Sequence, residues 1–298
     1  MEIIRFQVSV DCPIPFSNRK ESYWDNGLLL LPDSYSDTGT PTRLVINCHG
    51  AGGTVSTDDS QVEHQILSCY LLANGFAIMD VNGLPDQYSQ EFGIDIRNNI
   101  GSPIATDSYV AAYHYCISHY NLKRDVFVHG GSMGGISSTN LVLSGRIPVI
   151  AQTGFCPVLD TYNEIFLHPW SGGLPKTALG ILYSLDRDAG GEWIYREERI
   201  QDCNPMASTK PHPCPLLFCH CANDPVVNPQ ITKDYIARAK AQGVEAELLL
   251  LPDGGHEPQL YGEPVADPMG KTAFRGEILS ITPAIEAVFR WISSHQPT

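Results

Sequence analysis

The sequence is poor in positive charge. Its 298 residues include 19 Lys and Arg against 33 Asp and Glu, for a formal net charge of −14, and they contain no run of basic residues. Nucleic acids and anionic membrane surfaces are usually bound by clustered Lys and Arg side chains. We therefore expect neither nucleic acid nor a membrane as a partner.

Long apolar runs are also missing. No stretch approaches the roughly 20 apolar residues that span a bilayer, and the opening stretch MEIIRFQVSV lacks the basic start and apolar core of a signal peptide. At 43% hydrophobic and 17% charged, the chain can still bury a large core. We expect a soluble globular protein and favour the cytoplasm, with export after removal of a signal peptide left open.

Paired metal-binding cysteines are absent as well. The nine cysteines are odd in number, so at least one thiol is free, and Cys219-x-Cys221 lacks the second pair that a zinc site would need. We expect no metal site, and whether any disulfide forms is left open. The cysteines that lie inside apolar patterns, as is typical of reduced cysteines in a core, are Cys48, Cys116, Cys156, Cys219 and Cys221.

Short apolar runs alternate with amphipathic stretches from residue 43 onward. The runs predict strands and the stretches predict helices, one beginning near Thr106 and one opened by Asn228 and Pro229. This alternation predicts an α/β fold, with a mostly parallel sheet covered by helices on both faces. The predicted strands are 43–50, 76–82, 126–131, 148–155, 215–221 and 246–252, and a further helix is predicted at 62–73.

The residues before 43 follow a different pattern. FQVSV (6–10) and NGLLLLP (26–32) are separated by polar, turn-rich segments and carry no helix pattern, so we expect an antiparallel start to the sheet. The chain has no internal repeat and no low-complexity linker, which favours a single domain over residues 1–298. The stretch 160–210 interrupts the alternation and is expected to be an insertion within that domain.

A serine lies among four glycines in VFVHGGSMGG (126–135), where a strand pattern changes to a helical one. Gly130, Ser132 and Gly134 match G-x-S-x-G, in which the serine occupies a strained strand-to-helix turn and the glycines let the helix and the strand pack closely. In an open parallel sheet, ligands bind beyond the carboxyl ends of the strands, where this turn would lie. The motif alone is weak, so its interpretation depends on what accompanies it.

Two further residues complete the pattern of a Ser-His-Asp triad. Asp224 in NDPVV (223–227) follows one predicted strand, and His256 in PDGGH (252–256) follows the last one. Parallel strands end at one edge of a sheet, so we expect both side chains at the edge that carries Ser132. In such a triad the histidine removes the proton of the serine during attack, and the carboxylate holds the histidine in the right tautomer.

A glycine-rich turn, HGAGGT (49–54), follows an earlier predicted strand. Such a turn can direct backbone N–H groups at an oxygen that becomes negative beside the nucleophile. We expect an oxyanion hole made by the N–H of Ala51 or Gly52 together with that of Met133. This chemistry requires neither a cofactor nor a metal.

With these motifs the chain resembles the α/β-hydrolase superfamily, and within it the esterases and peptidases related to prolyl oligopeptidase, feruloyl esterases and polyhydroxybutyrate depolymerases. The resemblance covers residues 25–295 and is best at HGAGG, GGSMGG, NDPVV and GGH. It implies an eight-stranded, mostly parallel sheet whose second strand runs antiparallel. It also implies Ser132 as nucleophile, His256 as base and Asp224 as the orienting acid.

Other titratable residues near strand ends have simpler interpretations. His49, His129 and His220 are expected to be hydrogen-bonded structural histidines or pocket walls, because none of them follows the last strand. Asp160, after the strand 148–155, is the alternative acid of the triad. Asp253 is too close in sequence to His256 to be favoured and is expected to shape the turn.

The substrate is predicted from the insertion and from what the chain lacks. Aromatic residues in the insertion would suit a cap over the site, and Trp170 or Trp193 would offer a flat surface to a sugar or phenyl ring. Too few residues precede 43 for a separate peptide-selecting domain, and the glycines and prolines of the insertion exclude a long lipase-type lid helix. We expect as partner a small-molecule ester with a small or aromatic acyl group and a soluble alcohol, for example an acylated carbohydrate.

Three other functions were weighed. A serine peptidase of the prolyl-oligopeptidase type is the alternative activity, and a non-catalytic binding module on the same fold is the alternative outside enzymes. Dinucleotide binding is rejected because Val55 stands where G-x-G-x-x-G, begun by Gly50 and Gly52, needs its last glycine. The oligomeric state is left open.

Overall fold

The structure is a computed structural model that describes residues 1–56, 60–167 and 174–295. The strands of its main sheet are β1 (Glu2–Pro13), β2 (Lys20–Leu31), β3 (Arg43–Cys48), β4 (Phe76–Val81), β5 (Val126–Gly131), β6 (Val149–Phe155), β7 (Leu216–Cys221) and β8 (Ala246–Leu251). They follow the order β1-β2-β4-β3-β5-β6-β7-β8, and β2 is antiparallel to both of its neighbours. All other neighbouring pairs are parallel, which confirms the predicted sheet.

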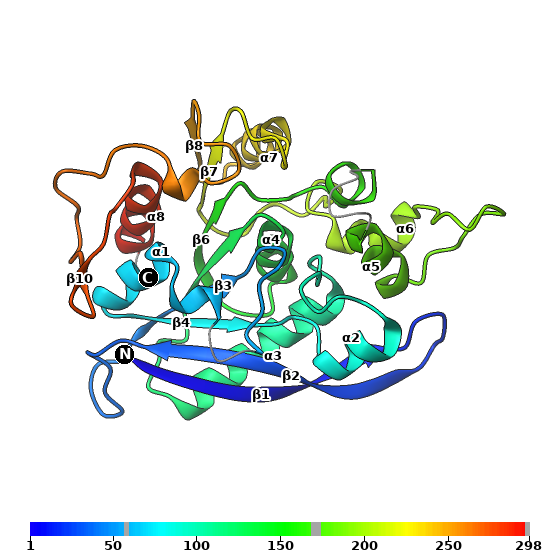
Figure 1. The fold of residues 1–298 in the computed structure, drawn as a ribbon, viewed down its shortest axis with the longest axis horizontal. Coiled ribbons are helices and arrows are strands. Elements are labelled where there is room, and N and C mark those ends of the chain that lie inside the picture. The colour runs from blue at the N-terminus through cyan, green and yellow to red at the C-terminus, as the bar shows by residue number, and fades with distance from the viewer. Residues whose placement is uncertain (57–59, 168–173, 296–298) are drawn as a thin grey trace.

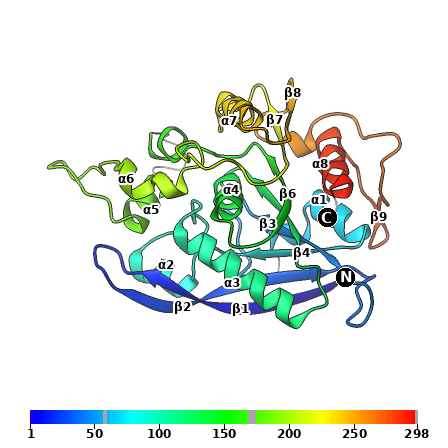
Figure 2. The same ribbon diagram turned by 180° about the vertical axis from the view of Figure 1, so that it is seen from behind.

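Helices cover both faces of this sheet (Figures 1 and 2). The strand β5 shows the division, because Val126 and Val128 join one buried apolar cluster and Phe127 joins another. The first cluster includes residues of α3 (Pro103–His119) and α4 (Gly134–Ser144), and the second those of α1 (Ile66–Ala73) and α8 (Pro283–Ser294). The remaining helices include α2 (Asp86–Phe92) and α7 (Pro229–Ala241), which packs on β7 and β8.

Capping residues explain where the helices begin. The Asn228 side chain accepts a hydrogen bond from the Gln230 N–H at 3.0 Å, as expected for an N-cap followed by proline. Ser102 caps α3 in the same way, so that this helix begins three residues earlier than the pattern predicts. The predicted helix at 62–73 is divided into a 3₁₀ turn (Gln61–Glu63) and α1.

The insertion between β6 and β7 packs against the turn that joins β1 to β2. The Trp193 and Phe16 rings stack with centroids 6.4 Å apart, and the Phe16 N–H donates to the Ser184 hydroxyl at 2.7 Å. Its described elements are a π-helical turn (Tyr162–Phe166), α5 (Leu174–Leu182), α6 (Glu197–Ile200) and a 3₁₀ turn (Gln201–Cys203). Trp170 lies outside the described residues.

The loop that follows β8 lies beside α1. It contains a 3₁₀ turn (Pro258–Leu260) and a small hairpin of β9 (Ala273–Phe274) and β10 (Glu277–Ile278). All nine cysteines are within the described ranges, and each is buried and free. No helix in these ranges is both long and apolar enough to cross a bilayer.

Candidate active site

Ser132 stands in the tight turn between β5 and α4. Its backbone φ is +52°, a left-handed conformation that strains a residue other than glycine. Two hydrogen bonds to the chain after β6 hold it there: the Ser132 N–H donates to the Phe155 carbonyl and the Val158 N–H donates to the Ser132 carbonyl, both at 2.9 Å. The turn therefore carries the serine beyond the carboxyl end of β5.

The glycines of the motif are required by close packing at particular positions. A Cβ atom at Gly134 would lie 1.9 Å from the Cys48 carbonyl oxygen at the end of β3, and one at Gly130 would lie 2.3 Å from the Gly134 carbonyl oxygen. At Gly131 the nearest atom would be 3.9 Å away, which is an ordinary contact. The G-x-S-x-G glycines thus allow α4 to pack closely against the strands, whereas Gly131 has no such role.

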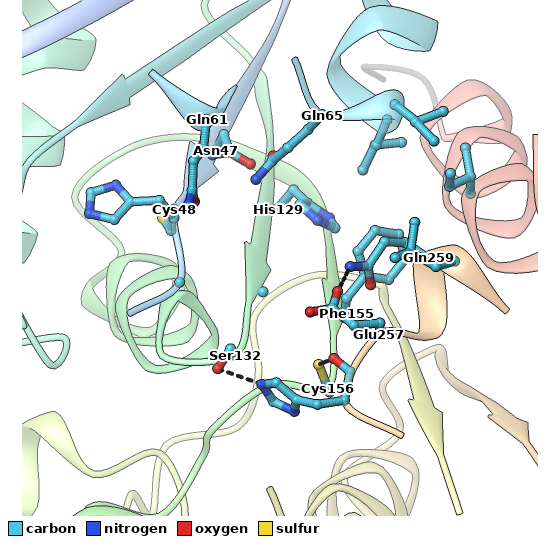
Figure 3. A pocket seen from close by; sticks show the side chains of 18 of the residues that line it. Asn47, Cys48, Gln61, Gln65, His129, Ser132, Phe155, Cys156, Glu257 and Gln259 are labelled. Atoms are coloured by element: carbon cyan, nitrogen blue, oxygen red, sulfur yellow. Dashed lines mark hydrogen bonds between the residues drawn. The ribbon is translucent and has the colours of Figure 1, made fainter. Parts of the chain in front are cut away.

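A continuous chain of hydrogen bonds joins Ser132 to His256 and Asp224. The Ser132 Oγ lies 2.9 Å from His256 Nε2, the bond drawn as the dashed line from Ser132 in Figure 3. His256 Nδ1 in turn lies 2.9 Å from Asp224 Oδ2. The Asp224 side chain is fully buried, whereas the His256 side chain is 21% exposed. The three residues come from the ends of three strands, β5, β7 and β8, and the fold brings them together as the sequence predicts.

Four donors surround the Asp224 carboxylate. Besides His256, the His220 Nε2 lies 3.1 Å from Oδ2, and the N–H groups of Val226 and Val227 donate to Oδ1 at 2.8 and 3.0 Å. Burial opposes ionisation of this carboxyl, but the hydrogen bonds from His220 and His256 and from the two backbone groups outweigh it and hold its pKa below the ordinary value. Asp224 is therefore a carboxylate at neutral pH.

The loop after β3 lies directly against the serine turn. A Cβ atom at Gly50 would be 3.3 Å from the Gly131 carbonyl oxygen and 3.5 Å from Ser132 Cβ. Gly52 has φ +86° with open space around it, so backbone conformation is what requires glycine there. No acceptor within the described residues is recorded for the N–H of Ala51, Gly52 or Met133, and of these three residues Ala51 lines the cavity beside Ser132.

His49 and His129 are buried and bonded elsewhere. His49 Nδ1 lies 3.2 Å from Asp80 Oδ1; burial lowers the pKa of His49, but the Asp80 carboxylate outweighs it, so the net shift is upward. His129 Nδ1 lies 2.9 Å from the Thr153 hydroxyl, and burial lowers its pKa to about 3, so its ring is neutral. Both rings help to form the cavity wall and neither contacts the Ser132 hydroxyl.

Asp160, the alternative acid, and Asp253, the disfavoured one, both have other partners. Asp160 accepts hydrogen bonds from the backbone N–H groups of Tyr162 and Asn163, and so caps the turn after β6. Asp253 accepts from the Asn223 side chain and from its neighbour's N–H, within the turn that precedes His256. Neither carboxylate is hydrogen-bonded to His256.

Cys156 is a site residue that the sequence did not single out. Its Sγ donates to the His256 carbonyl at 3.3 Å, and it forms with Asp224 and His256 a cluster whose potential metal-ligating atoms lie within 4.8 Å of one another. Burial and the Asp224 carboxylate raise the pKa of the Cys156 thiol well above its ordinary value, so the thiol is protonated. Because the other two groups are engaged in the hydrogen-bond chain, this cluster fits a proton-transfer site better than a metal site.

The comparisons with known proteins rest on structure. No family model matches the chain, and no curated protein matches it. It is similar to acylaminoacyl peptidase from Pyrococcus horikoshii, with a TM-score of 0.60 and 13% identity over 88% of this chain and 38% of that one. It is also similar to a puromycin-hydrolyzing peptidase from Mycobacterium tuberculosis, with a TM-score of 0.61 and 17% identity over 85% of this chain and 36% of that one. For esterase LipW from Mycobacterium marinum the TM-score is 0.54 and the identity 17%, over 87% of this chain and 74% of that one.

The chain has the α/β-hydrolase fold. At identities of 13% to 17%, these similarities establish the fold and do not specify a reaction. The chain spans less than two fifths of the length of either peptidase. What it does must therefore be argued from its own site.

A cavity of about 440 Å³ opens beside Ser132 on the α1–α8 side of this α/β-hydrolase fold. Apolar residues, among them Leu67, Phe155 and Ile285, form part of its wall. In Figure 3, Ser132 lies at one end and Gln61 and Gln65 lie at the other. Its described lining includes the amides of Asn47, Gln61, Gln65 and Gln259 and the carboxylate of Glu257, and no Lys or Arg is among these described residues.

Of the two tryptophans expected to face the substrate, Trp193, the one within the described residues, is not part of this cavity. The Trp193 ring packs on Gly180 and stacks with Phe16, and the Arg187 guanidinium lies 3.8 Å from its ring centroid. No described residue of 160–210 lines the cavity. The glutamines that do line it were missed because they lie in and beside a short 3₁₀ turn, where no motif marks them.

Proposed function

We propose that this chain is a serine hydrolase that cleaves carboxylic esters through an acyl-enzyme. The observation that carries the proposal is the hydrogen-bond chain from Ser132 Oγ through His256 to Asp224, with both distances at 2.9 Å. The strained serine, and the N–H groups of Ala51, Gly52 and Met133, for which no acceptor is recorded within the described residues, add independent support. A non-catalytic binding module would need none of these features.

The geometry is suited to a two-step reaction. His256 Nε2 takes the Ser132 proton while the hydroxyl attacks the ester carbonyl, and the Asp224 carboxylate stabilises the resulting imidazolium. The carbonyl oxygen becomes negative and accepts hydrogen bonds from Met133 and from Ala51 or Gly52. His256 then gives the proton to the departing alcohol, and a water activated by His256 releases the acid from Ser132.

The cavity supports an uncharged substrate. A group joined to the reacting carbonyl would pass the apolar wall at Phe155 and end near Gln61 and Gln65. Amide side chains hydrogen-bond hydroxyl groups, whereas the described lining has no Lys or Arg to pair with a carboxylate or a phosphate. This arrangement suits a small or aromatic acyl group, or the hydroxyls of an acylated carbohydrate.

Peptide hydrolysis is the second candidate activity. It is favoured by the similarity to two peptidases, although the chain spans less than two fifths of either one. A panel of acetyl, butyryl, hydroxycinnamoyl and prolyl-peptide substrates separates the two activities. We expect the highest kcat/KM for one of the esters, and preference for the prolyl amide would make the chain a peptidase.

Replacement of the nucleophile tests the mechanism. Ser132→Ala should abolish turnover of p-nitrophenyl acetate and covalent labelling by a fluorophosphonate, while the circular dichroism spectrum stays that of the wild type. Ser118→Ala, in an exposed serine of α3, is the matched control and should keep both reactions. Full activity of Ser132→Ala would contradict the proposal.

A further inference from the structure

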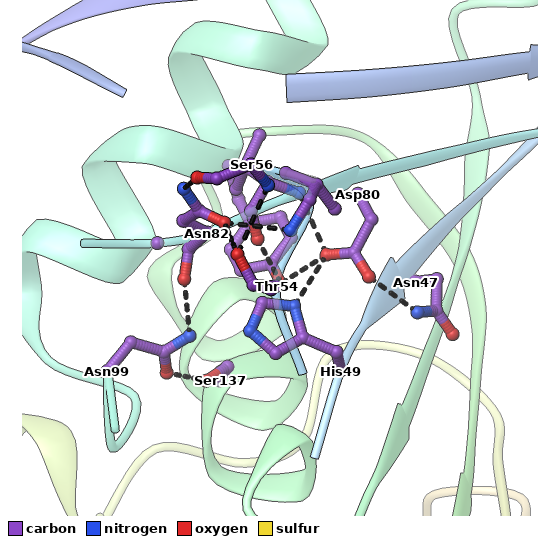
Figure 4. A network of polar contacts seen from close by, with 12 residues as sticks. Asn47, His49, Thr54, Ser56, Asp80, Asn82, Asn99 and Ser137 are labelled. Carbon is purple, nitrogen blue, oxygen red and sulfur yellow. Dashed lines mark hydrogen bonds and ion pairs between the residues drawn. The ribbon is translucent and has the colours of Figure 1, made fainter. Parts of the chain in front are cut away.

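Asn82, directly after β4, binds three consecutive residues of the loop that carries the proposed oxyanion donors (Figure 4). Its Oδ1 accepts from the Thr54 hydroxyl and from the Val55 N–H, each at 2.9 Å. Its Nδ2 donates to the Ser56 hydroxyl at 2.6 Å. Asn82 is fully buried and does not line the cavity, so it acts on this loop and not on a bound substrate.

The other end of the same loop is held by His49. Its ring bonds to Asp80, and the loop folds so closely over the ring that a Cβ atom at Gly53 would lie 2.8 Å from His49 atoms. Between these two anchors, one backbone hydrogen bond is recorded within the loop, from the Gly53 N–H to the Gly50 carbonyl at 3.1 Å. The N–H groups of residues 51 and 52 are therefore positioned mainly by what holds the loop at its ends.

A second set of bonds connects Asn82 to the helix that follows the nucleophile. The Asn99 side chain donates to the Asn82 carbonyl at 2.9 Å, and its oxygen accepts from the Ser137 hydroxyl, in α4, at 2.8 Å. Asn99 and Ser137 are both buried. The oxyanion loop and the helix that begins beside Ser132 are thus joined by one buried polar network (Figure 4).

We propose that Asn82 is a positioning residue of the oxyanion hole, which sets the distance between the loop donors and Ser132. This inference rests on the proposed function. Hydrogen bonds that form only in the transition state depend steeply on geometry, and a displacement of about 1 Å can cost roughly 100-fold in rate. Loss of Asn82 would remove three of the hydrogen bonds that hold this end of the loop, where Arg5 also bonds the Val55 carbonyl, and would loosen the loop and weaken the transition-state bonds.

The test compares Asn82→Ala with the wild type, with competent sites counted by fluorophosphonate titration. For p-nitrophenyl acetate, kcat per titrated site should fall about 10- to 100-fold, while KM stays within about twofold. The affinity for phenylboronic acid, whose tetrahedral serine adduct places an oxygen in the hole, should fall by a similar factor. Asn82→Asp keeps the oxygen that accepts from Thr54 and Val55 and should recover most of the lost rate.

Asn74→Ala is the matched control for a merely structural effect. Asn74 also makes three hydrogen bonds, one to Tyr70 and two to Lys271, but these hold the loop beside α1. We expect it to lower the melting temperature and leave kcat per titrated site unchanged. The inference is overturned if Asn82→Ala keeps its kcat, or loses kcat without losing affinity for the boronic acid. A wild-type protein that reacts with no fluorophosphonate would instead remove the proposed function on which the inference rests.

Discussion

His220 Nε2 lies 3.1 Å from Asp224 Oδ2, the carboxylate oxygen that His256 Nδ1 also reaches. The same His220 nitrogen faces the Val227 carbonyl at 3.2 Å, whereas its Nδ1 faces the Thr232 hydroxyl at 2.9 Å. A nitrogen that faces two acceptor oxygens carries the proton, so His220 donates through Nε2 and accepts from Thr232. It therefore supports the charged form of Asp224.

Removal of this donor should weaken the triad. In His220→Leu the Asp224 carboxylate loses one of the hydrogen bonds that depress its pKa, so the pKa rises and the carboxylate protonates earlier as the pH falls. We expect kcat to fall about tenfold at neutral pH and to fall further on the acid side of the pH profile. Profiles of kcat/KM for wild type and variant check this, and superimposable profiles would show that His220 has no part in the reaction.

Two Asp→Asn variants test which carboxylate is the acid of the triad. Asp224→Asn should lower kcat by about four orders of magnitude, because the amide favours the wrong tautomer of His256. Asp160→Asn should leave kcat within about threefold, because the recorded bonds of the Asp160 carboxylate go to its own turn and to Asn204, and none goes to His256. Steady-state rates with p-nitrophenyl acetate distinguish them, and the reverse ranking would exchange the two roles.

The parts of the fold that could be predicted from the sequence are those with local signals. Buried parallel strands appear as continuous apolar runs, and the carboxyl ends of those strands meet at one sheet edge. For this reason Ser132, Asp224 and His256 could be placed together although 124 residues separate the first from the last. The start of the helix at Pro229 could be predicted for the same reason, because its Asn-Pro cap is a local signal.

The parts that could not be predicted depend on tertiary contacts. The position of Trp193 follows from its packing with Phe16, a residue far away in sequence, and no periodic pattern records such a contact. Of the two glutamines in the cavity wall, Gln61 lies in a 3₁₀ turn and Gln65 immediately precedes α1, and propensity is weak in such short turns. His220, which also donates to Asp224, could be predicted to be a structural histidine, but its partner could not be predicted from the sequence.

The far end of the cavity can be probed with two esters that differ by one hydroxyl group. If Gln65 binds the end of the substrate, the wild type should prefer a hydroxyphenylpropanoyl ester to the phenylpropanoyl ester. Gln65→Leu should reduce this preference about three- to tenfold, the value of one neutral hydrogen bond. Trp193→Ala is the control and should leave the preference unchanged, because that ring is absent from the cavity wall. If the preference disappears in Trp193→Ala instead, the substrate binds against the insertion and not at Gln65.

The last prediction concerns Asp25, a fully buried acid of β2 whose Oδ2 accepts a hydrogen bond from the Gly83 N–H. Burial raises its pKa from 3.8 to about 7, so the folded protein holds a proton that the unfolded chain releases at lower pH. A raised carboxyl pKa gives stability that is fully present below the unfolded value and is lost as the pH rises toward the folded one. Between about pH 4 and 7, this group should therefore lower the free energy of unfolding by on the order of 4 kcal/mol.

Asp25→Asn removes that loss, so denaturant unfolding near pH 8 should find the variant more stable relative to wild type than near pH 5. Exposed Asp267→Asn is the control, and an Asp25→Asn difference that does not change with pH would show that Asp25 is already ionised in the folded protein.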